Sequence, residues 1–337
     1  MKVFMIGGTG LLGSQAAGEL IRRGHEVASV ALPPVPEGAH LPPEMKIEFC
    51  NYMELADEEL KKHLRGCAGF VFAAGVDERV EGPPPVYEMF KKYNIAPLER
   101  LLRAARECGV KRAVICGSYF CYFDKLWPEK QLTKWHPYIR SRRDQEDMAL
   151  SFAAEDFDVS VLELPYIFGT QPGRKPVWTF LVEAILGMKK ATLYPKGGSA
   201  MITVRQAGEA ISGALERSQG AKYYPIGYYN LTWTEMLKIV HKHLGCPDRK
   251  IKTIPNWMYA IGARRIMKEQ KAKGHEGGLN MVKFTDLQCS NLFIDKSLGC
   301  EPLGVGPDDI EAAIGESIIL SCEVLNGKTN VIGMKGE

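Results

Sequence analysis

The stretch KVFMIGGTGLLG, residues 2–13, decides the fold of this 337-residue chain. An apolar run of strand length leads directly into glycines at positions 7, 10 and 13. Glycine can adopt the positive φ of a tight strand-to-helix turn, and its bare backbone lets a phosphate approach the helix N-terminus. Residues 12–21 then place apolar side chains on one helical face. An ordinary glycine-rich turn is the alternative, but this context favours a dinucleotide-binding fingerprint.

Composition limits the function classes. The chain is 45% hydrophobic and 25% charged, as in ordinary globular proteins, and its net charge of +3 is too small to indicate a nucleic-acid partner. Nine cysteines form no C-x-x-C motif, which favours reduced thiols, and no apolar stretch approaches the ~20 residues of a membrane helix. We therefore expect a cytoplasmic protein with no membrane or nucleic-acid partner and with a small-molecule substrate.

Strand and helix patterns alternate through the first half, which predicts an α/β fold with a doubly wound parallel sheet of the Rossmann type. The expected helices cover residues 11–23, 57–64, 86–108 and about 137–155. The expected strands cover residues 2–6, 26–32, 46–50, 69–74, 112–116 and 159–164.

The pattern changes after residue 164. A polar loop at 169–176 and an apolar helix at 177–186 precede a strand at 200–204, which we expect to return to the sheet, and a helix at 207–216. We predict a dinucleotide-binding domain of residues 1–168, with 198–222 returning to it. Residues 169–197 and 223–337 would form a smaller, discontinuous substrate-binding domain.

Ser118 lies just past the strand expected at 112–116. In a doubly wound fold, ligands bind outside the carboxyl ends of the strands, so this hydroxyl could bond a substrate oxygen. A serine that closes a local turn is the alternative.

Tyr138 and Arg142 are four residues apart in a predicted helix, so both side chains share one face. A neighbouring cation favours the phenolate, so Arg142 should lower the pKa of Tyr138 towards neutral pH and allow proton exchange. An aromatic–arginine surface pair is the alternative. His241 and His243 lie two apart and do not share a helical face, so we expect no metal site.

Several further motifs occur in a fixed order along almost the whole chain. They are Gly7-x-x-Gly10-x-x-Gly13, Ala73-Ala74-Gly75, Asn94, Gly109-Val110-Lys111-Arg112, Ser118, Tyr122, Tyr138, Pro165-Tyr166-Ile167-Phe168-Gly169, Tyr228-Tyr229-Asn230-Leu231-Thr232-Trp233 and Asp295-Lys296-Ser297-Leu298-Gly299. In this order and spacing the chain resembles an extended or atypical short-chain dehydrogenase/reductase of the NAD-dependent epimerase/dehydratase type.

The resemblance implies that Ser118 orients a substrate carbonyl or hydroxyl and that Tyr138 is the general acid/base. The family places a lysine four residues after the tyrosine, and this chain has Arg142 there. Arginine keeps the positive charge, but its planar fork differs from the compact ammonium group. The catalytic set of Ser118, Tyr138 and Arg142 is therefore altered rather than deleted.

The resemblance also implies a nicotinamide cofactor. The acidic residue that binds the adenosine ribose in NAD-dependent members is missing at Ala31, which leans towards NADP. No arginine or lysine stands at Ser14 or Leu32, so NAD and NADP both remain open. Asn51 replaces an acidic residue near the adenine and could instead cap a turn. The expected cofactor-binding residues are Gly7, Thr9, Gly10, Leu11, Leu12, Gly13, Asn51, Tyr52, Ala73, Ala74, Gly75, Asn94, Cys116, Gly117, Pro165 and Ile167.

Three functions follow from these expectations. The first is an NAD(P)-dependent oxidoreductase that exchanges a hydride between the nicotinamide and a carbonyl or alcohol carbon of a small organic substrate. The second is a nucleotide-sugar epimerase or dehydratase, in which the cofactor is reduced only transiently. The third, suggested by Arg142, is an NAD(P)-binding sensor with reduced catalysis. The two long helices often pair in the family, so a homodimer is also an expectation.

Overall fold

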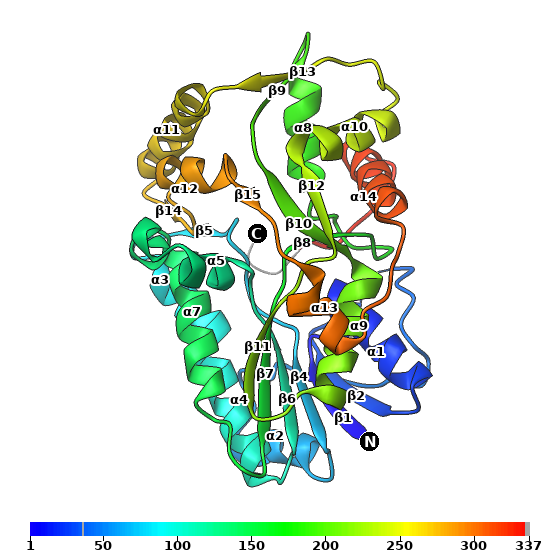
Figure 1. The fold of residues 1–337 in the computed structure, drawn as a ribbon. Coiled ribbons are helices and arrows are strands. Elements are labelled where there is room, and N and C mark those ends of the chain that lie inside the picture. Colours follow the sequence, from blue (N-terminus) through cyan, green and yellow to red (C-terminus); the bar gives the residue numbers. More distant parts are fainter. Residues whose placement is uncertain (36, 334–337) are drawn as a thin grey trace.

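The computed structural model describes residues 1–35 and 37–333. A seven-stranded sheet has the order β11-β7-β6-β4-β1-β2-β3, and every neighbouring pair is parallel (Figure 1). The predicted doubly wound sheet is thus confirmed, and its six expected strands lie within two residues of their expected bounds. The strands are β1 (Lys2–Ile6), β2 (Glu26–Ala31), β3 (Lys46–Phe49), β4 (Gly69–Phe72), β6 (Arg112–Cys116), β7 (Asp158–Glu163) and β11 (Ala221–Pro225).

Helices cover both faces of this sheet because its central strands are apolar on both sides. Val3 and Met5 of β1 face the cluster formed by α1 (Leu11–Arg22) and α9 (Val204–Arg217), which pack on each other. Phe4 and Ile6 point to the opposite cluster, as the two-residue period of a strand requires. The helices of that second face are α2 (Asp57–Leu64), α4 (Ala96–Glu107) and α7 (Pro137–Leu150).

The expectation that residues 200–204 return to the main sheet is wrong. Strand β10 (Gly198–Thr203) pairs instead with β8 (Tyr166–Phe168), β12 (Tyr229–Thr232) and β15 (Asn291–Leu292) in a separate sheet. The strand that does return is β11, next to β7. An apolar run predicts a buried strand but carries no information about which sheet will bury it.

A second region of the molecule lies beyond the carboxyl ends of the main strands (Figure 1). Its core holds Phe168, Trp178 and Trp233, and Trp178 stacks on Phe168 at 4.3 Å between ring centroids. Around this core lie α8 (Thr179–Gly187), α10 (Trp233–His243) and α14 (Ile310–Leu325). The expected domain boundaries remain a prediction, and residues 36 and 334–337 of the expected domains lie outside the described residues.

The remaining elements are short or peripheral. They are β5 (Glu81–Gly82), α3 (Tyr87–Phe90), the π-helical η1 (Lys91–Ile95), α5 (Phe120–Leu126), η2 (Pro128–Lys130), α6 (Leu132–Trp135), β9 (Thr192–Pro195), β13 (Ile251–Ile254), α11 (Asn256–Ala272), β14 (Glu276–Gly277), α12 (Met281–Gln288), η3 (Lys296–Leu298) and α13 (Cys300–Leu303). None of the helices within residues 1–35 and 37–333 combines the length and the apolar composition needed to cross a membrane.

A buried ionic cluster joins α5, α7 and β7. The Lys125 ammonium lies 2.7 Å from a Glu146 carboxylate oxygen and 2.9 Å from a Glu163 oxygen, and both carboxyl groups are almost fully buried. Arg143 also pairs with Glu146 at 2.6 Å. Burial, followed by the neighbouring Glu146 charge, raises the pKa of Glu163 to about 8. The cluster therefore holds Glu163 as a neutral carboxylic acid near pH 7.

Glu163→Gln tests this protonation state. The ordinary pKa of Glu163 is 4.5 and its folded-state pKa is about 8, so the folded protein binds the extra proton between these values. The wild type should lose stability as pH rises through that window, by on the order of 1 kcal/mol per pH unit at most, and the variant should not. Chemical denaturation at pH 5 to 8.5 measures this slope. Glu183→Gln, at an exposed position of α8, is the matched control. If the unfolding free energies of wild type and Glu163→Gln change with pH in parallel, Glu163 is not a neutral acid near pH 7.

Candidate functional site

The glycine turn after β1 is built for close backbone contacts. Gly7 has a φ of +88°, and its carbonyl accepts the Gly10 N–H at 2.9 Å. A Cβ on Gly13 would lie 2.0 Å from the same carbonyl oxygen, so only glycine fits there. Helix α1 begins at Leu11, and no side chain caps it. Its first N–H groups therefore remain available for an anion, as the phosphate of a dinucleotide requires.

Asn94 fixes the chain that leaves β4. It is fully buried in the π-helical segment Lys91–Ile95, a rare conformation that often occurs at functional sites. Its carboxamide oxygen accepts the Val76 N–H at 2.8 Å, and its NH2 group donates to the Val76 carbonyl at 3.1 Å. The oxygen and the nitrogen of the Asn94 carboxamide both form hydrogen bonds with Val76. Asn94 therefore holds the segment after Gly75 against the site. The expected single helix at 86–108 is interrupted by this π-helical turn.

Tyr138 and Arg142 do lie together at the start of α7. The Arg142 Nε donates to the Tyr138 hydroxyl at 3.2 Å, and both side chains are buried. The guanidinium also donates to Gln145 at 2.9 Å and to the carbonyls of Cys116 and Val76 at 3.4 and 3.3 Å. Arg142 thus connects the catalytic tyrosine candidate to the ends of β4 and β6, so the surface-pair alternative is excluded.

The expected lowering of the Tyr138 pKa towards neutrality is wrong. Burial raises the pKa of Tyr138 to about 12, and this outweighs the lowering caused by the Arg142 charge. Negative charge on Glu78 and Asp77 raises it further. The sequence shows the neighbouring cation but not the loss of water around the phenol, which here is the larger effect. Tyr138 is therefore a protonated hydroxyl at neutral pH.

Ser118 lies on the same edge of the sheet, two residues after β6 ends. Its buried hydroxyl accepts the Phe120 N–H at 3.4 Å, so it also closes the turn that starts α5. The ring of Phe120 meets the edge of the Tyr138 ring at 6.4 Å between centroids. Phe120 thus contacts both residues, and no hydrogen bond joins Ser118 to Tyr138 among the described residues.

The other expected cofactor residues fall into two groups. The first group lies at the glycine turn and the start of α1: Thr9, Gly10, Leu11 and Leu12. The second group lies at strand ends: Ala73, Ala74, Gly75, Gly117 and Pro165 follow strands, Cys116 is the last residue of β6, and Ile167 lies in β8. Asn51 caps its own turn by accepting the Met53 N–H at 3.2 Å, as the alternative for that residue proposed. Tyr52 packs on the core of the second face, and burial raises its pKa to about 12. These contacts leave the binding role of Asn51 and Tyr52 a prediction.

Glu78 is the residue that sequence analysis missed. It follows β4 in the segment held by Asn94, and its negative charge raises the pKa of Tyr119, Tyr138 and Tyr166. Burial, followed by repulsion from Asp77, raises the pKa of Glu78 itself to about 7. The signal in the sequence was the adjacent pair Asp77-Glu78 directly after the Gly75 turn. A carboxyl group poised near neutral pH beside a tyrosine can exchange protons in a reaction.

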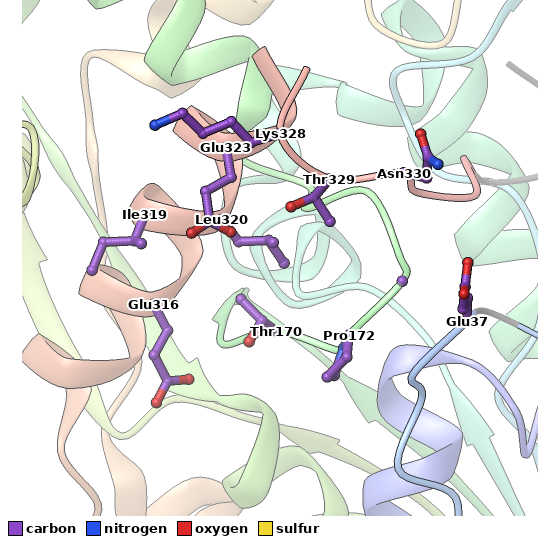
Figure 2. Close-up of a pocket in the computed structure, with 11 residues that line it drawn as sticks. Glu37, Thr170, Pro172, Glu316, Ile319, Leu320, Glu323, Lys328, Thr329 and Asn330 are labelled. Atoms are coloured by element: carbon purple, nitrogen blue, oxygen red, sulfur yellow. The ribbon is translucent and has the colours of Figure 1, made fainter. Parts of the chain in front are cut away.

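Two of the surface cavities are lined by other residues and do not contain Tyr138. The larger, of about 590 Å³, lies between α14 and the loop of Thr170 and Pro172, with Glu37 on its other side (Figure 2). The smaller, of about 360 Å³, is bordered by α1 and by His40. Neither cavity identifies a substrate site, so the site rests on the side chains at the strand ends.

A family model matches residues 3–227 of this chain, and its description is the NAD dependent epimerase/dehydratase family. The chain belongs to that family. The match spans the glycine turn, Ser118, Tyr138 and Arg142, so the resemblance inferred from those motifs is confirmed at the level of the family. Comparison with curated proteins gives no significant match.

Solved structures share the fold of the whole chain. The protein gox2253 has a TM-score of 0.74 at 19% identity, over 97% of this chain and 99% of that one. PA4631, a nucleoside-diphosphate-sugar epimerase from Pseudomonas aeruginosa, has 0.69 at 18%, over 98% and 99%. UDP-glucose 4-epimerase from Bifidobacterium longum, in complex with NAD+ and UDP, has 0.65 at 14%, over 97% and 99%. At these identities the likeness establishes the fold.

Asn94→Ala tests whether the Asn94 amide holds the site. The variant would leave the Val76 N–H without its buried acceptor and the Val76 carbonyl with Arg142 as its other donor, so we expect it to lower the free energy of unfolding by about 2 kcal/mol. Urea denaturation gives this value. Asn51→Ala removes an amide from a more exposed turn and should lower stability by less than about 1 kcal/mol. Equal effects of the two substitutions would contradict the role of Asn94.

Proposed function

We propose that the protein is an NAD(P)-dependent enzyme that exchanges a hydride at a carbonyl or alcohol carbon of its substrate. The observation that carries this proposal is the buried Tyr138–Arg142 pair, held at the ends of β4 and β6 in a family of NAD-dependent epimerases and dehydratases. The turn at Gly7 to Gly13 fits a dinucleotide, because a Cβ at Gly13 would meet backbone and α1 lacks a side-chain cap. When bound, the nicotinamide supplies or accepts the hydride.

The residues of the chain would manage the proton that accompanies the hydride. Tyr138, protonated at neutral pH, donates its hydroxyl proton to the substrate oxygen when a carbonyl is reduced, and takes it back in the reverse direction. Arg142 stabilises the phenolate that remains and keeps the ring in place through its bond to the hydroxyl. Ser118 would orient the substrate oxygen. Glu78, with a pKa of about 7, would exchange the proton with Tyr138 or with the substrate.

The similar structures favour two refinements of this proposal. Several were solved with NAD or NAD+, which does not support the lean towards NADP drawn from Ala31, so we propose NAD. Several similar structures, including one of those NAD+ complexes, are named as epimerases of nucleotide sugars. An epimerase cycle, with oxidation and re-reduction of one sugar carbon, is therefore the second candidate function, and it uses the same Tyr138.

Tyr138→Phe tests the acid–base role. Removing the hydroxyl should lower turnover by about 10²–10⁴-fold and leave NADH binding nearly unchanged, because the variant keeps the ring and its packing. The measurements are NADH fluorescence titration and assays of nucleotide sugars, ketones and aldehydes. Tyr224→Phe is the matched control, since Tyr224 is also buried, lies in β11 and donates its hydroxyl to Ser218 Oγ at 3.2 Å. Turnover by Tyr138→Phe at the wild-type rate would overturn the mechanism.

Glu78→Gln tests the second proton carrier. If the Glu78 carboxylate acts as a base, kcat/KM in the direction of alcohol oxidation should rise with pH to a plateau above its pKa of about 7. The variant should lose this inflection. Asp77→Asn provides a sharper comparison: it removes the repulsion that raises the Glu78 pKa, so the inflection should move to lower pH. An unchanged inflection in Glu78→Gln would exclude Glu78 as its source.

A further inference from the structure

The loop at residues 169–176 reaches from the second region onto the glycine turn. The Gln171 amide donates to the Thr9 carbonyl at 3.1 Å and to the Ser14 hydroxyl at 3.2 Å. Arg174 donates through Nη2 to the same Thr9 carbonyl at 3.3 Å and through Nε to Gln171 at 2.7 Å. A guanidinium is thus held against the turn whose uncapped N–H groups are proposed to bind a dinucleotide phosphate.

Among the described residues, no anion lies beside the charge of Arg174. Arg23, Arg143 and Arg205 each lie within 4 Å of one or more carboxylates, whereas no carboxylate in residues 1–35 or 37–333 pairs with Arg174. Burial lowers the pKa of Arg174, as expected for a cation that has lost water and has no carboxylate partner in the described part of the chain. A partly buried cation that bonds only neutral oxygens is well suited to bind an anion that arrives with a ligand.

Packing fixes the position of this loop. Gly173 has a φ of +72°, and a Cβ there would lie 2.1 Å from the Glu37 carbonyl, so the loop touches the segment that follows β2. Ile332, near the end of the described chain, donates its N–H to the Gly173 carbonyl at 2.9 Å and accepts the Lys175 N–H at 3.1 Å. Figure 2 shows the loop at Thr170 and Pro172 between α14 and the Glu37 segment. Arg174 is therefore presented by a loop that is supported on both sides.

We propose that Arg174 binds a phosphate group of the dinucleotide, so that the second region of the molecule takes part in holding the cofactor. The proposal rests on the proposed function and adds a residue to it. A guanidinium can bond two phosphate oxygens at once while keeping its bond to Thr9. The loop contacts the glycine turn through Arg174, where the pyrophosphate of either cofactor would lie. It also contacts the segment after β2 at Glu37, so a 2′-phosphate is a second candidate ligand of Arg174.

Calorimetric titration of Arg174→Gln with small probes tests this assignment. The probes are ADP, which carries the diphosphate, 2′-AMP, which carries the 2′-phosphate, and adenosine, which carries neither. We expect Arg174→Gln to weaken ADP binding by about tenfold or more and to leave adenosine binding unchanged. Arg174→Lys should recover part of the affinity, because it restores the charge without the fork. A loss confined to 2′-AMP would support the proposal with the 2′-phosphate as the ligand.

Arg249→Gln is the matched control. Arg249 also bonds only neutral oxygens, namely Thr192 Oγ1 at 3.0 Å and the carbonyls of Ile185 and Met188, but it lies in the second region away from the glycine turn. Its substitution should leave ADP binding unchanged. Equal affinity of wild type and Arg174→Gln for both ADP and 2′-AMP would overturn the role of Arg174 alone. A wild type that binds neither ADP nor NADH would overturn the proposed function as well, and an equal loss of adenosine binding would show that Arg174 acts only on the structure.

Discussion

The contact between the Gly7 carbonyl and Gly13 is the constraint on which the rest of the structure depends. It brings the start of α1 against the end of β1 more closely than any side chain would allow. Helix α1 then packs on α9, and both cover one face of the parallel sheet. The same contact leaves the first N–H groups of α1 uncapped at the edge where β4 and β6 also end. The Gly7–Gly13 contact therefore determines both how α1 packs on the sheet and where its uncapped N–H groups lie.

Chemistry at this edge is set by a balance between burial and charge. Tyr138, Arg142 and Glu78 sit in a region with little water, where burial raises the pKa of both acids and leaves the guanidinium charged. The arginine that replaces the usual lysine reaches four partners at once, including the carbonyls of Val76 and Cys116. A lysine ammonium has only three donors. The substitution thus ties the tyrosine to both strand ends as well as keeping a cation beside it.

The sequence predicted those features that depend on residues close together in the chain. The glycine turn, the strand bounds and the i, i+4 pairing of Tyr138 with Arg142 all depend on nearby residues, and the structure agrees with them. Properties that depend on distant segments were not predictable in this way. The sheet chosen by β10, the water lost around Tyr138 and the approach of Glu78 each depend on which parts of the chain pack together. The π-helical turn at Asn94 also looks like ordinary helix in the sequence.

The loop at 169–176 shows why a missing residue at one strand does not settle cofactor recognition. Ala31 offers no carboxylate at the end of β2, and Ser29 uses its hydroxyl to accept the Gly8 N–H at 3.2 Å. Gln171 and Arg174 approach the same turn from a segment more than a hundred residues later in the chain. Residues such as Gln171 and Arg174, in the second half of the chain, can thus supply polar contacts that the end of β2 lacks. Because that loop is continuous with α8 and the second core, a ligand held by Arg174 at the glycine turn would also be in contact with the second region of the molecule.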